Sequence, residues 1–349
     1  MTTDSNNSIN HTDAISPSAT REVSQPNSST PSHSNSSTKK KNGRLKGNLC
    51  MLIAKTFSGI NQNALKYLLP NWMNAYTGVV LRLGFGSIFF WILGWVRPQK
   101  ENKMTNRDRL LLLGAGVVFV FGFMWTFLLG LTYTTPISSS IFICLQAAVV
   151  YLITLCLRTD RFSWGRFAGI ILGIGGALVI ILTQKHSATA SNPLLGNLLS
   201  LLSTFLFGSY LVTEKIFLKK YSNSTVSKYT FSGGAIAGLI YVLITGTWFA
   251  PVLHQGIFST PFLILAFILI FPTCLSYLLT DFGLKLLPAT VVALYSNWIL
   301  IVSAIISYAT GQDQFSWWQP LAMILIILSV WFVERAEAGD RSKRLGKES

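Results

Sequence analysis

Long apolar stretches alternate with short polar breaks from Gly47 to Val333. Each stretch has roughly the 17 to 25 residues that a helix needs to cross the hydrocarbon core of a bilayer. The pattern therefore predicts an all-α, multi-pass transmembrane protein with ten transmembrane helices, which span residues 47–69, 74–95, 110–131, 137–157, 164–182, 194–217, 226–248, 261–281, 289–309 and 317–333.

The ends of the chain have a different composition. The first 38 residues form a tract of Ser, Thr, Asn and Pro with almost no apolar residue. Such a tract cannot bury enough apolar surface to offset the entropy of ordering it. We expect residues 1–46 to be a disordered tail and residues 334–349 to be a second, C-terminal tail. The tract also lacks the basic start and apolar core of a signal peptide.

The distribution of basic residues predicts the orientation of the helices. The chain has 28 Lys and Arg against 13 Asp and Glu. With ten helices, almost all 28 fall in the tails and in alternate loops, whereas the other face holds only Lys66 and Lys185. Short cytoplasmic loops are enriched in Lys and Arg, so both termini are expected in the cytoplasm and the chain in the cell membrane. Because these cations lie between apolar blocks, the net charge of +15 does not indicate a nucleic-acid-binding face.

A repeat divides the chain into two halves. The tripeptide Phe162-Ser163-Trp164, which follows Asp160, recurs as Phe315-Ser316-Trp317, which follows Asp313. Pro136 and Pro288, which begin the fourth and ninth predicted helices, repeat at nearly the same offset. We expect one five-helix repeat at residues 47–183 and another at 194–333. Because five is odd, the second half must be inverted relative to the first, as in many secondary transporters.

Several short motifs resemble those of a known family. They are Ser58-Gly59-Ile60-Asn61 with Lys66, Leu81-Arg82, the Gly-rich run 169–176, and the small-residue runs 134–140 and 287–293. In order and spacing they are similar to the EamA-type ten-helix permeases of the drug/metabolite transporter (DMT) superfamily, over residues 50–333. The chain departs from the family pattern where Gln146 and Trp298 lie near the positions of an expected proline, and where Asp160 and Asp313 replace glutamate. The resemblance implies a transporter.

The sequence carries no recognisable catalytic machinery. It has no GxxxxGK[ST] motif for phosphate binding, no HExxH motif and no CxxC pair, and its four His lie outside the predicted helices. We therefore expect no enzyme activity, no cofactor and no metal site. Glu214 and Asp281 lie near helix ends, where we expect them to be solvated interfacial charges, and for Asp281 alone an inward position stays open. With no carboxylate expected at the midplane, coupling to protons through a buried acid is not indicated.

Two cations lie inside predicted helices. Arg82 follows the start of the second helix by about eight residues, or roughly 12 Å, which is deep in the hydrocarbon core. It can bind an anionic or carboxylate-bearing substrate, or it can clamp a neighbouring helix, and the resemblance favours the clamp. Lys55 can instead extend to the cytoplasmic interface.

Neutral polar and aromatic residues within the helices complete the candidate substrate site. A buried amide without a partner costs several kcal/mol, so each amide needs either substrate or another helix, and an aromatic ring can line a cavity or face lipid. The candidate site residues are Asn61, Arg82, Trp125, Gln146, Tyr210, Tyr277, Tyr295 and Asn297. GxxxG spacing at Gly169–Gly173 and Gly234–Gly238 indicates close helix packing and is compatible with a homodimer.

Two classes of function remain. The first is a permease that moves a small metabolite by alternating access, with efflux of an amino acid or a related solute ahead of drugs or nucleotides. The second is a non-transporting polytopic sensor or a lipid-modifying membrane enzyme. Inverted repeats and the lack of catalytic groups favour the permease, whose partners would be a small-molecule substrate and the lipid bilayer.

Overall fold

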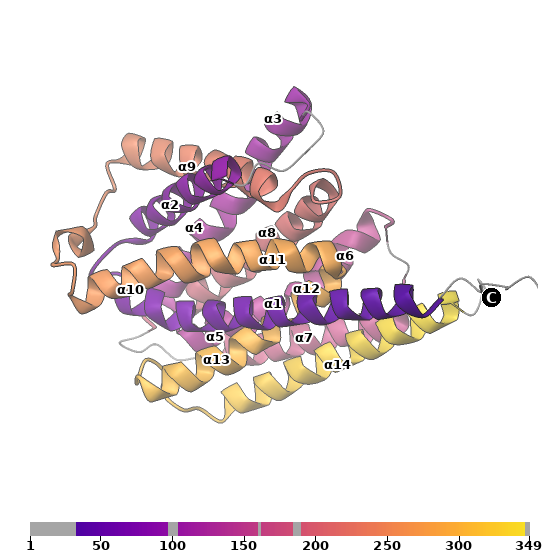
Figure 1. The fold of residues 1–349 in the computed structure, drawn as a ribbon. Coiled ribbons are helices and arrows are strands. Elements are labelled where there is room, and N and C mark those ends of the chain that lie inside the picture. Colours follow the sequence, from indigo (N-terminus) through magenta and orange to yellow (C-terminus); the bar gives the residue numbers. More distant parts are fainter. Residues whose placement is uncertain (1–32, 97–103, 160–161, 184–189, 346–349) are drawn as a thin grey trace, which may run out of the picture. The chain divides into compact units, whose positions relative to one another are not determined.

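The computed structural model describes residues 33–96, 104–159, 162–183 and 190–345. The chain divides into two units, residues 1–40 and residues 41–349. Residues 33–40 are helical in the first unit, and residues 1–32 of the predicted tail lie outside the described residues. All further observations concern the second unit, which is a bundle of helices (Figure 1).

The predicted all-α fold is confirmed. The first half contains α1 (His33–Leu68), α2 (Ala75–Val96), α3 (Asn106–Ala115), the π-helix η1 (Gly116–Phe121), α4 (Gly122–Tyr133), α5 (Pro136–Cys144), α6 (Gln146–Cys156) and α7 (Trp164–Thr183). The second half contains α8 (Pro193–Phe217), α9 (Asn223–Thr245), the short 3₁₀ helix η2 (Pro251–His254), α10 (Thr260–Ile268), the π-helix η3 (Leu269–Leu275), α11 (Ser276–Leu286), α12 (Ala289–Leu294), α13 (Ser296–Ala309) and α14 (Trp318–Leu345). α1 begins before Gly47 and α14 continues past Val333, so both helices extend into segments predicted as tails.

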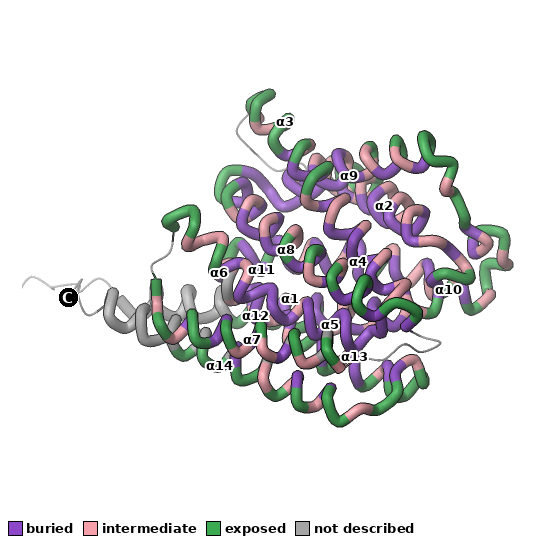
Figure 2. Tube along the Cα trace, turned by 180° about the vertical axis from the view of Figure 1, so that it is seen from behind, coloured by how far each residue is buried: buried purple, intermediate pink, exposed green. Residues whose placement is uncertain are grey.

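The helices have the length and surface of a membrane protein. Seven helical segments in the described residues are long and apolar enough to cross a bilayer. Many residues on the outer turns of the helices are exposed (Figure 2). Large apolar side chains are among them: Trp95 is 84% exposed, Ile244 is 79% exposed and Leu243 is 72% exposed. A water-soluble monomer rarely presents so much apolar surface, whereas lipid tails readily cover it. The chain is an integral membrane protein.

Irregularities recur at matching places in the two halves. The π-helix η1 interrupts the third helix between α3 and α4, and η3 interrupts its counterpart between α10 and α11. Leu145 separates α5 from α6 with a ψ of −6°, and Tyr295 separates α12 from α13 with a ψ of −11°. π-Turns inside α-helices occur often at functional sites. The matching interruptions show that the halves share local structure as well as short motifs.

The two broken helices meet each other directly after their breaks. The Ser296 hydroxyl donates to Gln146 Oε1 at 2.6 Å, and the Cys144 thiol contacts the Ser296 carbonyl oxygen at 3.6 Å. A polar side chain placed here finds its partner across the interface between the halves, which satisfies it in an apolar environment. The breaks therefore contact each other across the halves.

One end of the bundle, which we call the Lys66 end, is held by two charged side chains. The Lys66 ammonium donates to the carbonyl oxygens of Leu131, Thr132 and Thr134 at 2.9, 3.3 and 2.7 Å. These carbonyls belong to the last turn of α4 and its exit, where a helix leaves its carbonyls unpaired. The Asp313 carboxylate accepts from the Ile137 N–H at 3.1 Å. A cation thus stabilises the end of α4 while an anion stabilises the start of α5.

The opposite end, which we call the Asp108 end, holds the start of α3 and the α8–α9 connection. The Tyr221 hydroxyl donates to Asp108 Oδ2 at 2.6 Å, and Lys220 lies 4.0 Å from the same carboxylate.

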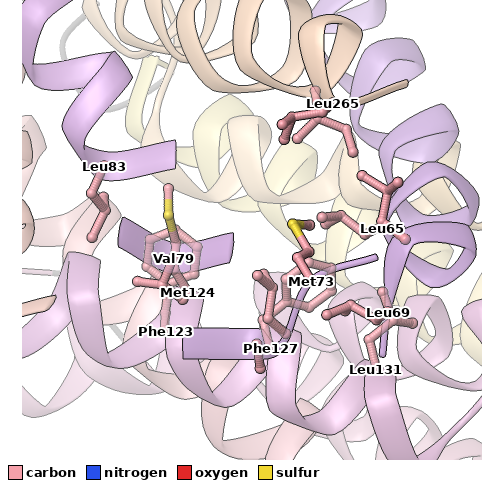
Figure 3. Packing of buried hydrophobic residues seen from close by; sticks show 14 of the residues in the cluster. Leu65, Leu69, Met73, Val79, Leu83, Phe123, Met124, Phe127, Leu131 and Leu265 are labelled. Atoms are coloured by element: carbon pink, nitrogen blue, oxygen red, sulfur yellow. The ribbon is translucent and has the colours of Figure 1, made fainter. Parts of the chain in front are cut away.

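The largest apolar core of the bundle spans several helices, and Figure 3 shows Val79 of α2 with Phe123 and Phe127 of α4 in this core. Both phenylalanines also reach the cavity described next.

Candidate functional site

A cavity of about 700 Å³, including its open mouth, lies between the two halves. α1, α2, α4, α5 and α6 of the first half line it, together with α8, η3, α11 and α13 of the second half. Ligand cavities in proteins combine apolar walls with a few polar groups. The lining of this cavity has that composition.

Two buried cations line the cavity. Lys55 is 3% exposed and Arg82 is 4% exposed. The Arg82 Nε donates to Thr273 Oγ1 at 3.0 Å, and the Thr273 hydroxyl in turn donates to the Ile268 carbonyl oxygen at 2.8 Å within the π-turn. Arg82 therefore clamps the neighbouring helix, as one sequence interpretation held, and it also faces the cavity.

Lys55 is placed differently from the sequence expectation. Its ammonium lies 5.6 Å from the centre of the Phe207 ring, which is a cation–π contact inside the bundle. The expected extension to the interface does not occur, because Lys55 faces the cavity from α1 and is covered by α8. A buried ammonium without a carboxylate partner is costly, and it favours the binding of an anion.

Amide groups provide the neutral polar part of the lining. Asn61, Gln62 and Gln146 line the cavity and are at most 5% exposed. Within the described residues, Asn61 Oδ1, Gln62 Oε1 and Gln146 Nε2 have no hydrogen-bond partner. Asn63, one residue further along α1, instead donates to the Ser303 carbonyl oxygen at 3.0 Å. The site therefore offers two free acceptors and one free donor beside its two cations.

The remaining walls are aromatic or hydroxyl-bearing. Phe123, Phe127, Phe207 and Tyr277 supply the aromatic surface. The hydroxyl groups mostly tie the wall helices together: Ser203 of α8 donates to the Phe123 carbonyl oxygen of α4 at 3.0 Å, and Ser276 of α11 donates to the Ala54 carbonyl oxygen of α1 at 2.8 Å. Helices from both halves are thus fixed around the cavity.

The structure brings some of the predicted site residues to the cavity. Asn61, Arg82, Gln146 and Tyr277 line it. Lys55, Gln62 and the phenylalanines of the wall were not in the predicted set. Gln62 and Lys55 carried a detectable signal, namely a polar side chain in an apolar helix, whereas a phenylalanine in such a helix gives none because lipid-facing positions prefer it too.

The other predicted site residues lie outside the cavity lining. Trp125 stacks on Phe121 at 6.2 Å, Tyr210 donates to Glu214 Oε1 at 2.6 Å, Asn297 donates to the Leu294 carbonyl oxygen at 2.7 Å, and Tyr295 lies at the break between α12 and α13. Tyr210 and Asn297 thus have local partners three or four residues away along the chain, and Tyr210 is buried rather than facing lipid.

The expectation of a solvated charge near a helix end was wrong for Glu214, which is 1% exposed. Asp281 is 0% exposed and takes the inward position that the sequence left open for it. Both carboxyls are covered because Ser227 of α9 contacts Asp281 and the ring of Tyr210 shields Glu214. Sequence position along a helix does not show that a neighbouring helix covers it.

Metal ligation has no support in the described part of the chain, where no three His, Cys, Asp or Glu side chains gather. The cavity lining itself contains amides, hydroxyls, rings and cations. This set suits the non-covalent binding of a polar solute.

Comparison with known proteins places these features in a family. The model of the EamA-like transporter family matches residues 45–182 and again residues 194–335. An uncharacterized transporter of Bacillus subtilis, YyaM, is 24% identical over 276 residues, which cover 78% of this chain and 88% of the relative. An uncharacterized transporter of Archaeoglobus fulgidus is 24% identical over 243 residues, covering 69% of this chain and 80% of the relative.

A solved crystal structure shares the fold. It aligns with a TM-score of 0.60 over 85% of this chain and 98% of the other, at 15% sequence identity. Because the family model matches most of the chain in two successive repeats, this protein belongs to the EamA-like transporter family.

Proposed function

We propose that the cavity binds an amino acid or a related small solute and that the protein exports this solute by alternating access. One observation supports the substrate class. The same cavity holds two buried cations, Lys55 and Arg82, and two amide oxygens that no donor of the described residues reaches, on Asn61 and Gln62. An amino acid has a carboxylate for the cations and an ammonium for the oxygens.

The binding energy would come from groups that are already desolvated. A carboxylate bound to Lys55 or Arg82 forms a charge-assisted hydrogen bond, which is about twice as strong as a neutral one. The free donor on Gln146 Nε2 can contribute a further hydrogen bond to the carboxylate. Phe123 and Phe127 provide an apolar wall for the side chain of the solute.

The construction of the two halves supports alternating access. Both halves line the cavity, and each has a π-turn and a broken helix at matching places. In other transporters built on inverted repeats, discontinuous helices surround the substrate and one repeat rocks against the other. Here the contact between Gln146 and Ser296 lies at the junction of the breaks.

The basic residues of the tails and alternate loops support an orientation with both termini in the cytoplasm of the cell membrane. We propose outward transport of the solute, with the lipid bilayer and a possible second copy of the chain as partners. Inside-out membrane vesicles from expressing cells would accumulate the solute if the direction is outward, whereas right-side-out vesicles would accumulate it if the direction is inward.

Counterflow in proteoliposomes, screened with the twenty amino acids, nucleosides and organic anions, tests the substrate class. We expect flux of at least one amino acid, and we expect Lys55→Met and Arg82→Gln to reduce it at least tenfold. Lys228→Met serves as the matched control, because Lys228 stacks on Trp91 at 4.9 Å and is not part of the cavity lining.

No flux of any solute through correctly folded protein would contradict the carrier function. Binding of an amino acid without flux would favour the non-transporting sensor. Flux confined to nucleosides would contradict the substrate class alone.

A further inference from the structure

Glu214 of α8 and Asp281 of α11 form a buried carboxyl pair beside the cavity. Their carboxyl groups lie within hydrogen-bonding reach of each other. Glu214 is 1% exposed and Asp281 is 0% exposed. Two carboxylates cannot make this contact, since both are acceptors, so one of the two carboxyls must hold a proton.

The remaining oxygens of the pair show where that proton lies. The Tyr210 hydroxyl donates to Glu214 Oε1 at 2.6 Å, and the Ser227 hydroxyl donates to Asp281 Oδ2. Glu214 Oε2 and Asp281 Oδ1 receive no donor from any other side chain of the described residues. The shared proton therefore fits between Glu214 Oε2 and Asp281 Oδ1, where it satisfies two oxygens that would otherwise be buried and unpaired.

The charges around the pair do not replace the proton. On α11, the charge of Lys285 acts on Asp281, but Lys285 is exposed, so solvent weakens this effect. Tyr277, also on α11, interacts with both acids. On α8, the Lys215 ammonium is engaged with the Leu287 carbonyl oxygen at 2.6 Å. On α9, the Ser227 hydroxyl contacts Asp281, and the Thr230 hydroxyl lies beside Tyr210.

The pair is connected to the cavity through aromatic rings. Phe207, which lines the cavity, stacks on Tyr210 at 6.0 Å and meets Tyr277 edge-on at 6.5 Å. Tyr277 also lines the cavity and lies close enough to Arg82 for an electrostatic interaction. A change of charge at the pair therefore acts on the cation side of the cavity across one layer of side chains.

We propose that Glu214 and Asp281 are the proton-binding site that couples solute transport to the proton gradient, a role that rests on the function proposed above. One proton is bound between the carboxyls in the conformation described here, in which the pair joins α8 to α11. In the alternate conformation the helices separate, water reaches the pair, and the proton leaves to water. Two adjacent carboxylates repel, so deprotonation favours this separation.

Coupling to protons also gives the transport a direction. A proton that enters the cell down its gradient binds the pair and resets the carrier after the solute has left. Export against a solute gradient then requires no nucleotide hydrolysis, which agrees with the lack of a phosphate-binding motif in the sequence.

The proton can be tested without a substrate. Infrared difference spectroscopy of purified wild-type protein against Glu214→Gln and against Asp281→Asn should show, at neutral pH, the carbonyl stretch of a protonated carboxylic acid that each variant lacks. Asp108→Asn serves as the control, because the Asp108 carboxylate accepts a hydrogen bond from Tyr221 and is not part of the pair. If wild-type protein and the variants show no such difference, the two carboxyls do not share a proton. This conclusion holds whether or not the protein transports.

Coupling is tested in proteoliposomes that contain the pH-sensitive dye pyranine. Addition of an amino acid that shows counterflow should move protons in the opposite direction, and an imposed pH gradient should stimulate its flux. In Glu214→Gln and Asp281→Asn, counterflow should persist while the proton movement and the stimulation are lost. Wild-type counterflow without any proton movement would overturn the coupling role.

Loss of folding is separated from loss of coupling by Tyr210→Phe and Ser227→Ala, which keep both carboxyls but remove one donor each. We expect these variants to remain coupled, with the pH of half-maximal proton release shifted upward. The reason is that each hydroxyl stabilises the deprotonated form. No shift in either variant would contradict the assignment of the proton to this pair.

Discussion

At the scale of single residues, the buried charges of this protein have two kinds of environment. Lys66 and Asp313 at the Lys66 end are engaged with backbone groups at the α4–α5 turn. Lys55 and Arg82 instead face a cavity. The first kind is structural, since its partners lie within the chain, and the second has capacity left for a ligand. Sequence alone identified Lys55 and Arg82 as cations inside helices but did not show which partners they have.

Asp313 gives a prediction about pH. Burial raises the pKa of its carboxyl above the ordinary value of 3.8, while hydrogen bonds from Thr135, Ile137 and Ser307 and the charge of Lys66 oppose this shift. Because the native state holds this proton more tightly than the unfolded chain, the free energy of unfolding falls as pH rises from the ordinary value through the native pKa. Above the native pKa this contribution is constant.

The variant Asp313→Asn should remove this dependence of the free energy of unfolding on pH. We expect the melting temperature of wild-type protein in detergent to fall relative to that of the variant as pH rises from about 4, and the difference to level off above the native pKa. Thermal unfolding measured at a series of pH values checks this. Parallel curves for the two proteins would show that Asp313 does not titrate between the two states.

At the scale of elements, glycines set the approach of helices. The GxxxG pairs face helices of the same chain: a Cβ at Gly238 would lie 3.2 Å from Val80 of α2, and a Cβ at Gly173 would lie 2.9 Å from Leu145. The sequence predicted close packing at these pairs. The homodimer stays a prediction.

The closest approach is the crossing of α9 with α3 and η1. A Cβ at Gly116 would lie 2.1 Å from the Thr230 carbonyl oxygen, and a Cβ at Gly233 would lie 2.1 Å from the Leu113 carbonyl oxygen. Both obstacles are backbone atoms, so the helices themselves would have to move. We expect Gly116→Ala and Gly233→Ala each to lower the free energy of unfolding by about 1–3 kcal/mol.

Gly114→Ala is the matched control, since a Cβ there meets nothing within 4 Å. In an exposed helical position, alanine should be neutral or slightly stabilising relative to glycine. Thermal unfolding of the three variants in detergent measures the difference. Equal melting temperatures for Gly116→Ala and Gly114→Ala would contradict the close crossing.

At the scale of the whole molecule, the basic residues make a prediction about orientation. If both termini are cytoplasmic, the Lys66 end faces the outside, because α1 follows the N-terminal tail and has Lys66 in its last turn. Alkaline phosphatase, which folds only outside the bacterial cytoplasm, should be active when fused after Gly311 and inactive when fused after Ser349. The reverse result would show that the whole bundle is inverted.

The sequence by itself determined the features that depend on local chemistry. Hydropathy gave an all-helical membrane protein, since a backbone in lipid must satisfy its hydrogen bonds within helices. The order of short motifs around Arg82, Pro136 and Pro288 indicated the family, and unpaired amides pointed to Asn61 and Gln146 as candidate site residues.

Only the tertiary structure decided which helices face one another, and the remaining results depend on this. It brought Lys55 to the cavity, left Tyr210 and Asn297 outside the cavity lining, and buried Glu214 and Asp281. Those two acids are far apart in the sequence, and each is near a helix end where solvation is the usual outcome. Their contact depends on the packing of α8, α9 and α11, which no local pattern encodes, because a helix in lipid can present apolar side chains on every face.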